Sequence, residues 1–184
     1  KYSKIEICFD TEGAQIRTSK IKNKTRTLKK NSYVYINKNN KNSNNITLTP
    51  SGIYEKLKIN DTLYIDFNSV QIKIISENPK TFKCKIVEGG VIGSNKSISV
   101  DRYINIPAFT EKDILAIELA KELNIKNIAL SFTSNAKDVR TLRSYFSENI
   151  IITSKIESKK ALTNLEEILE EADKILIDRG DLSK

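Results

Sequence analysis

The pattern of hydrophobic and polar positions changes twice along the chain. Residues 5–9 are a short apolar run that predicts a strand. Between residues 46 and 100, β-branched runs recur at short intervals and are separated by turn residues such as those at 50–52 and 89–90. After Pro107, amphipathic stripes of helical period alternate with continuous apolar runs. The chain therefore predicts a β-rich stretch between two parts of different character.

The stretch after Pro107 predicts helices and strands in strict alternation. The helices are expected over residues 110–123, 136–148 and 163–172, and the strands over residues 127–132, 150–156 and 174–177. Thr110 and Thr163 each precede an acidic residue by three positions, which is the spacing of an N-terminal capping box. Continuous apolar strands joined by amphipathic helices are typical of a parallel sheet in an α/β fold.

Charged residues and one threonine follow the predicted parallel strands at the points where the strands end. These residues are Asp10, Thr11, Lys155, Glu157, Arg179 and Asp181. Catalytic groups of parallel α/β folds gather at the carboxyl ends of the strands. Lys155 and Glu157 are two residues apart, so both point to the same side of their strand. The sequence predicts that a metal ion and an anion meet at this edge.

The composition limits the kinds of catalytic and metal site that the chain can form. The chain has 184 residues, a formal net charge of +8 and no His, which excludes catalysis through imidazole and disfavours a zinc site. Cys8 and Cys84 match no metal or redox spacing, so we expect both to be reduced core residues of a cytoplasmic protein. No apolar run approaches the ~20 residues that cross a bilayer, and no membrane partner is expected.

The segment of residues 20–41 concentrates basic side chains without any acidic one. It permits a second class of function, a nucleic-acid-binding module, with Tyr33 and Tyr35 as stacking platforms. Lys and Asn are abundant throughout the chain, however, and this general bias favours a solvated surface. We therefore expect no nucleic-acid partner.

Six short motifs, in order along nearly the whole chain, resemble the pyruvate kinase family. Residues 10–18, Asp-Thr-Glu-Gly-Ala-Gln-Ile-Arg-Thr, are similar to the family's Asp-Thr-Lys-Gly-Pro-Glu-Ile-Arg-Thr. The other five motifs lie at residues 89–96, 106–113, 128–132, 154–157 and 179–182. The resemblance implies part of a (β/α)8 TIM barrel, formed by residues 1–18 and 105–184, with a small all-β barrel inserted as a lid over residues 19–104. Because such a barrel takes ~250 residues, we expect a fragment of a longer enzyme.

The resemblance also implies an activity, ligands and residue roles. The reaction would be phosphoryl transfer between phosphoenolpyruvate and ADP, giving pyruvate and ATP, by a homotetramer. Lys155 would neutralise the transferred phosphoryl group, and Glu157 and Asp181 would bind Mg²⁺ or Mn²⁺. The backbone of Gly180 and Asp181, together with Lys155 and Ser131, would bind the substrate. The remaining implied contacts are K⁺ at Asp10 and Thr11, and nucleotide phosphates at Arg17 and Lys96.

Several positions depart from the family pattern and keep an alternative open. They are Glu12 for a lysine, Ala14 for a proline, Gln15 for the glutamate linked to K⁺ dependence, Asp66-Phe67-Asn68 for Asp-Asp-Gly, and Ser97, Ser134 and Ser183 for glycine, arginine and glycine. The alternative is a diverged homologue that binds a divalent metal and a phosphorylated ligand without glycolytic turnover.

Overall fold

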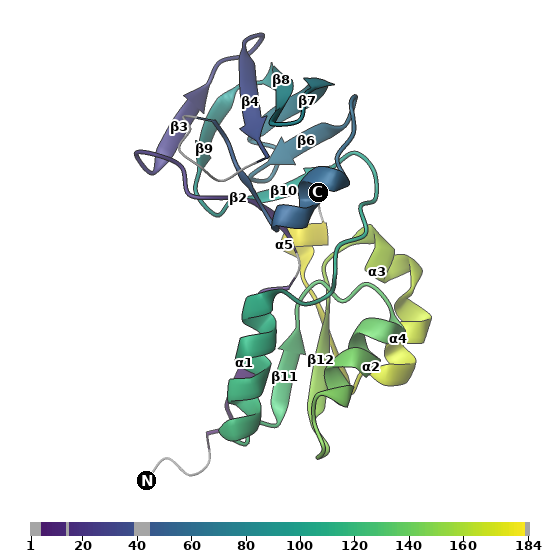
Figure 1. The fold of residues 1–184 in the computed structure, drawn as a ribbon. Coiled ribbons are helices and arrows are strands. Elements are labelled where there is room, and N and C mark those ends of the chain that lie inside the picture. Colours follow the sequence, from purple (N-terminus) through teal and green to yellow (C-terminus); the bar gives the residue numbers. More distant parts are fainter. Residues whose placement is uncertain (1–4, 14, 39–44, 183–184) are drawn as a thin grey trace. The chain divides into compact units, whose positions relative to one another are not determined.

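The computed structural model describes residues 5–13, 15–38 and 45–182, and the chain divides into two units (Figure 1). Lys1–Ala14 and Pro107–Lys184 belong to the first unit, and Gln15–Ile106 form the second. Ala14, Ser183 and residues 39–41 of the basic segment, all of which entered the sequence predictions, lie outside the described residues.

The first unit contains a parallel sheet of four strands in the order in which they follow along the chain. They are β1 (Cys8–Asp10), β11 (Asn127–Leu130), β12 (Ile151–Ile156) and β13 (Lys174–Ile177). Phe9 pairs with Ile128, which in turn pairs with Ile152. Every pairing in this sheet is parallel, so the predicted parallel α/β arrangement is confirmed.

The helices of this unit pack on one face of the sheet. They are α1 (Glu111–Glu122), α2 (Ala136–Ser144), α3 (Lys159–Thr163), α4 (Leu165–Glu171) and the short α5 (Arg179–Leu182). Ile117 of α1, Val139 of α2 and Ile168 of α4 share one buried core with Ile128 and Ile152 of the strands. Within the described part of the chain, no helix is long and apolar enough to span a membrane.

The N-termini of the helices test the capping predictions. The capping box of Thr110 and Asp113 is present at α1, as predicted. The box predicted at Thr163 is wrong, because the chain is already helical from Lys159 and the Thr163 hydroxyl donates to the carbonyl of that residue at 3.1 Å. Ser158 caps α3 instead. The sequence pattern located the helical region but not the residue at which the helix begins.

Two of the predicted apolar stripes are only partly buried. Leu169 of α4 is exposed, although Ile168 beside it is fully buried. On α1, Ile117 is buried, whereas Leu115, Leu119 and Leu123 are exposed. The leucines of α1 lie four residues apart and so share one side of the helix, away from the core of the unit.

The second unit is antiparallel. Its strands are β2 (Ile16–Thr18), β3 (Thr25–Leu28), β4 (Tyr33–Asn37), β5 (Leu48–Thr49), β6 (Thr62–Ile65), β7 (Val70–Glu77), β8 (Thr81–Glu88), β9 (Gly90–Gly93) and β10 (Ser97–Val100), with a 3-10 helix at Ser51–Glu55. Seven strands form one sheet in the order β4-β8-β7-β6-β10-β2-β5, and β3 pairs with β9.

The seven-stranded sheet curls until its two edges meet. The amide of Asn37, at the end of edge strand β4, donates to the carbonyl of Ile46 at 2.8 Å, and the amide of Ile46 donates to Tyr35 at 3.0 Å. Ile46 lies just before β5, the opposite edge strand. Inside the curl, Val34, Leu63 and Ile72 belong to one continuous core. Joining the edges removes unpaired backbone groups that would otherwise be exposed.

An ion pair between the half-buried Arg102 and the buried Asp61 connects the segment after β10 to the turn before β6. The guanidinium of Arg102 donates to both carboxylate oxygens of Asp61, at 2.7 and 2.8 Å, and Asp61 also accepts from the amide of Lys58. The hydrogen bond and negative charge of Asp61 outweigh the effect of burial and raise the pKa of Arg102. Such bidentate pairs fix geometry because both hydrogen bonds must align.

The two cysteines differ in environment. Cys84 is buried in the second unit, and burial raises the pKa of its thiol to about 12, so it stays protonated. Cys8 is exposed, and its predicted core location is wrong. The reason is its place on edge strand β1, where Phe9 faces the helices and the neighbouring Cys8 therefore points to the other side.

Asp173 is expected to stabilise the fold in a pH-dependent manner. Burial opposes its ionisation, but the amide of Ile152 and the guanidinium of Arg143, at 2.8 and 2.9 Å, lower its pKa below the ordinary 3.8. A lowered pKa stabilises the fold above about pH 3.8, and this contribution disappears as the pH falls through the folded-state value. In urea unfolding between pH 3 and 6, Asp173→Asn should be less stable than the parent, and the difference should shrink below pH 4. A difference that is constant with pH would contradict this assignment.

Candidate functional site

The carboxyl ends of β1, β11 and β12 bring three of the predicted site residues into contact. Lys155, at the end of β12, donates from Nζ to Ser131 Oγ at 3.0 Å and to Asp10 Oδ2 at 3.2 Å. Ser131 Oγ donates in turn to Asp10 Oδ1 at 2.9 Å. These residues are more than 20 positions apart in sequence, and the parallel register of the three strands places them side by side.

Glu157 completes a strand-end cluster with Asp10, Ser131 and Lys155. Its Oε1 lies 3.4 Å from Lys155 Nζ, and its side chain is only 3% exposed. Its Oε2 accepts a 2.6 Å hydrogen bond from the amide of Phe132. Burying a carboxylate is costly unless it is paired and hydrogen-bonded, and both conditions are met here.

Lys155 remains charged at neutral pH. Burial by itself lowers the pKa of the ammonium group, but the negative charge of Glu157 and the hydrogen bond to Asp10 outweigh it, so the pKa lies above the ordinary 10.5. The cluster thus holds one ammonium between two carboxylates, of which Asp10 is largely solvent-exposed and Glu157 is buried.

Thr11 ties the ends of β1 and β11 together. Its amide donates to the carbonyl of Ala129 at 3.0 Å, and its hydroxyl accepts from the amide of Ser131 at 2.9 Å. The side chain is buried. Glu12 follows with its amide on Asp113 Oδ1 at 2.7 Å, which links this loop to the start of α1.

The segment after β13 is described in its backbone and in part of its side chains. The amide of Gly180 donates to Asp178 Oδ1 at 2.9 Å, and the amide of Asp178 donates to the carbonyl of Ile156 at 3.1 Å. Asp181 lies in α5, and its side chain is outside the described part of the structure. The predicted pairing of Glu157 with Asp181 therefore stays a prediction.

The strand-end cluster contains few carboxylates that could bind a hard cation. A carboxylate offers about four lone-pair positions, and the carboxylate of Glu157 contacts both the amide of Phe132 and the ammonium of Lys155. Within the described residues, no three His, Cys, Asp or Glu side chains are close enough together to hold a metal ion. Mg²⁺ is usually held by one or two carboxylates, with substrate oxygens and water completing its octahedron.

The two predicted nucleotide-binding residues lie on neighbouring segments of the second unit. Arg17 of β2 donates to the carbonyl of Asn95 at 3.0 Å. Lys96, next in the chain, forms an ion pair with Asp66 at 2.9 Å. Thr18 fixes this turn, since its hydroxyl donates to Gly93 and accepts from the amide of Lys96. The structure thus brings Arg17 and Lys96 together within one unit.

Asp66 begins a turn of unusual backbone conformation. Asp66, Phe67 and Asn68 have φ values of 51°, 56° and 67°, the left-handed region that disfavours a bulky side chain. This is the place where the sequence departs from the family's Asp-Asp-Gly. The side chain of Phe67 is 61% exposed.

The tyrosines considered for base stacking have different surroundings. Tyr33 and Tyr35 both lie on the exposed face of β4. The ammonium of Lys83 sits 4.6 Å from the centre of the Tyr33 ring, which is a cation–π contact with one face of that ring. This contact gives Tyr33 a structural role within the sheet.

Sequence reasoning missed the backbone contacts that hold the strand-end cluster. The amide of Phe132, which fixes Glu157, carries no signature in the sequence because every residue except proline has one. The bond from Ser131 to Asp10 was missed as well, because Asp10 was expected at a strand end whereas Ser131 lay within the strand expected over residues 127–132.

Comparison with known proteins gives a consistent set of similarities. The family model for "Pyruvate kinase, barrel domain" matches residues 1–183. Proteins named pyruvate kinase from Buchnera aphidicola subsp. Acyrthosiphon pisum (strain APS) and Thermococcus litoralis are 32% and 30% identical over 97% of this chain. One from Dictyostelium discoideum is 31% identical, again over 97% of the chain. The chain spans 39%, 39% and 37% of the lengths of these relatives.

Proposed function

The chain belongs to the pyruvate kinase family, and we propose that its parent protein transfers a phosphoryl group between phosphoenolpyruvate and ADP, giving pyruvate and ATP. The single observation that carries this proposal is the strand-end cluster, in which Lys155 contacts Asp10, Ser131 and Glu157. Phosphoryl transfer depends on positioning and charge neutralisation more than on covalent chemistry, and this cluster offers both.

The proposed fold is a (β/α)8 barrel with the unit Gln15–Ile106 as its inserted β domain. Two features support a barrel. The four parallel strands lie in sequence order with their helices on one face, as in barrel winding, whereas doubly wound sheets reverse direction and carry helices on both faces. Leu176 and Ile177 on edge strand β13 are also exposed, as apolar residues would be where further strands are to pack.

Lys155 is the proposed phosphoryl-stabilising group. A charged ammonium held at 15% exposure acts in a setting where its charge is less screened than in water. Asp10 and Ser131 fix its position, so little reorganisation is needed as negative charge moves from the donor to the acceptor oxygen. Ser131 is proposed to line the phosphate site from the neighbouring strand.

Glu157 is the proposed ligand of a divalent cation, Mg²⁺ or Mn²⁺, with Asp181 as the second carboxylate. When bound, the cation would supply positive charge toward the phosphoryl oxygens. The chain's own contribution is to hold Glu157 ionised and oriented through the amide of Phe132 and the charge of Lys155. Asp10 and Thr11 are proposed for K⁺, and Arg17 and Lys96 for the nucleotide phosphates.

A coupled assay on the full-length parent tests the reaction. We expect pyruvate formation that requires phosphoenolpyruvate, ADP and a divalent cation together. Cation-dependent binding of phosphoenolpyruvate without pyruvate formation would replace the proposal with the diverged-homologue alternative, which the left-handed turn at Phe67 in the inserted unit favours. Absence of both binding and turnover would remove both.

A further inference from the structure

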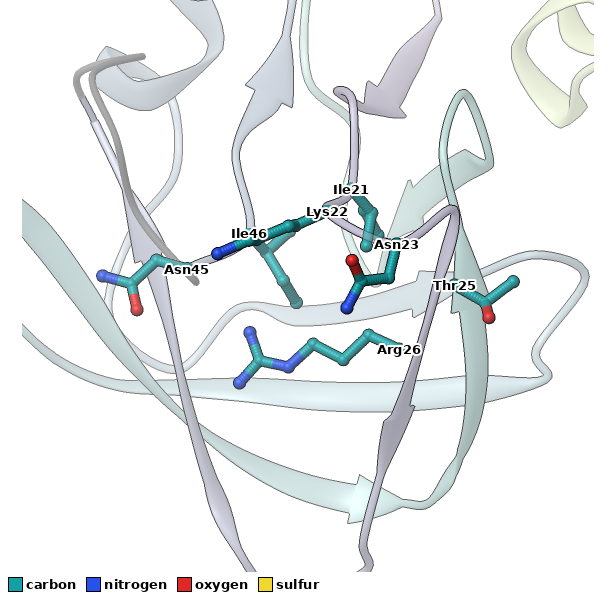
Figure 2. A pocket seen from close by; sticks show the side chains of 7 residues that line it. All are labelled: Ile21, Lys22, Asn23, Thr25, Arg26, Asn45 and Ile46. Carbon is teal, nitrogen blue, oxygen red and sulfur yellow. The ribbon is translucent and has the colours of Figure 1, made fainter.

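The second unit contains a pocket that the proposed reaction does not use. Its volume is about 300 Å³, and it is lined by Ile21, Lys22, Asn23, Thr25, Arg26, Asn45 and Ile46. In Figure 2, the side chains of Lys22, Asn23 and Arg26 extend toward a common space, whereas Thr25 points away from it. The volume is at the lower end of the range for small-molecule sites.

The polar groups of this pocket suit an anion. Its described lining contains two cationic side chains and two amides, and it contains no carboxylate. The guanidinium of Arg26 is planar and matches two oxygens of a phosphate, and Lys22 adds a compact positive charge. The amide of Asn23 can both donate and accept, which suits ester or hydroxyl oxygens, whereas the Asn45 side chain points away from the shared space in Figure 2.

Part of the pocket is apolar and held in place. Ile46 is 1% exposed, and its backbone pairs with β4 at the point where the edges of the sheet meet. The backbone of Ile21 is also held in place, because its amide donates a hydrogen bond to Ser94 Oγ at 2.8 Å. Because Ile46 is almost fully buried, the partly buried side chain of Ile21 is the apolar surface that the carbon part of a ligand can reach. Inorganic phosphate alone would leave this part of the pocket unfilled.

The turn that carries the polar groups has a defined backbone. Asn23 and Lys24 have φ values of 65° and 67°, and the amide of Thr25 closes the turn on the carbonyl of Asn23 at 2.8 Å. Asparagine tolerates this left-handed region better than most residues. A defined backbone reduces the entropy that a ligand must remove when it binds.

We propose that this pocket binds a small organic phosphate, with Arg26 and Lys22 on the phosphate group and Ile21 against the carbon body. The site lies wholly within the second unit, and none of its residues belongs to the strand-end cluster or to the proposed nucleotide contacts. It therefore does not depend on the proposed function, and no metal ion is needed to form it.

Calorimetric titration of the full chain with glycerol 3-phosphate tests the proposal. Binding should be saturable, and Arg26→Gln and Lys22→Gln should each raise Kd at least about tenfold, because each removes a charge-assisted contact. Lys29→Gln is the matched control, since Lys29 is exposed, lies just after the same strand and is not part of the lining. Its Kd should stay within about twofold of the parent.

Two further variants separate the outcomes. Asn23→Gly keeps the left-handed turn and removes one amide, so it should weaken binding while leaving the thermal unfolding midpoint unchanged. Loss of glycerol 3-phosphate binding in Lys155→Gln but not in Arg26→Gln would place the ligand at the strand-end cluster and overturn the proposal. Absence of saturable binding would also overturn it. So would tighter binding of a single-stranded oligonucleotide that Lys29→Gln weakens as much as Arg26→Gln, because that result indicates a general basic surface.

Discussion

Replacing Lys155 by Met in the full-length enzyme is expected to lower kcat for pyruvate formation by about 10³-fold. Methionine is of similar length and removes the charge. The ammonium that bridges Asp10, Ser131 and Glu157 would be lost from a position that is 15% exposed, where water cannot fully replace it. Because the proposed role of Lys155 is toward the transferred phosphoryl group, the change should appear mainly in kcat and only weakly in the KM for ADP.

The control for this variant is a lysine of the same unit outside the cluster. Lys121 lies on α1, where it pairs with Glu118 of the same helix at 3.3 Å, and Lys121→Met should keep kcat within about twofold. Circular dichroism and the thermal unfolding midpoint should show that Lys155→Met stays folded. Undiminished turnover in folded Lys155→Met would contradict the assignment of Lys155, and with it the proposed mechanism.

Part of the strand-end cluster could be predicted because the same local pattern, an apolar run that ends in charged residues, recurs along the sequence. Lys155 and Glu157 end one apolar run, and Asp10 ends another. Once the helix–strand alternation indicates parallel strands, their carboxyl ends must meet at one edge. The structure brings Lys155 into contact with Asp10 across 145 positions for this reason. Side-chain alternation then places Lys155 and Glu157 on one side.

Contacts that depend on long-range pairing could not be read from the same pattern. Strands β3 (Thr-Arg-Thr-Leu) and β9 (Gly-Val-Ile-Gly) lack a regular polar and apolar alternation, and β10 alternates over only four residues. These strands are defined by the neighbouring strands that pair with them. The bond from Phe132 to Glu157 uses a backbone amide, and the φ of 53° at Phe132 is imposed by the surrounding structure. The bidentate pair of Asp61 and Arg102 likewise depends on a contact 41 positions apart.

The same distinction explains where helix predictions failed. The box at Thr110 succeeded because Asp113 is free to fold back on its own N-cap. At Thr163, an equally good local pattern lost to Ser158, which starts the helix five residues earlier. Asn164, which separates α3 from α4, donates from Nδ2 to the carbonyl of Ser134 at 2.8 Å, and that tertiary contact accompanies the break. Tertiary contacts, rather than local propensity, therefore accompany the positions at which these helices begin and end.

Gly13→Ala is expected to destabilise the first unit by about 2 to 4 kcal/mol and to lower kcat by about 10²-fold. Gly13 has a φ of 72°, and an added Cβ would lie 2.8 Å from Phe132 Cδ2 and 2.9 Å from the carbonyl oxygen of Ser131. The carbonyl belongs to the backbone, so it cannot move without moving its neighbours. Those neighbours are the Ser131 hydroxyl that contacts Lys155 and the Phe132 amide that holds Glu157.

Two variants identify the cause of this loss, as measured by urea unfolding and steady-state kinetics. Gly52→Ala is the matched control, because an added Cβ meets nothing within 4 Å there, and its stability should change by no more than about 0.5 kcal/mol. Gly13→Asn separates conformation from crowding, since asparagine accepts a positive φ but still carries the Cβ. If crowding against Ser131 and Phe132 dominates, Gly13→Asn should lose kcat as strongly as Gly13→Ala. Recovery of the unsubstituted protein's kcat in Gly13→Asn would instead assign the loss to backbone conformation alone. The close approach of Gly13 to Ser131 and Phe132 would then not matter for positioning Lys155 and Glu157.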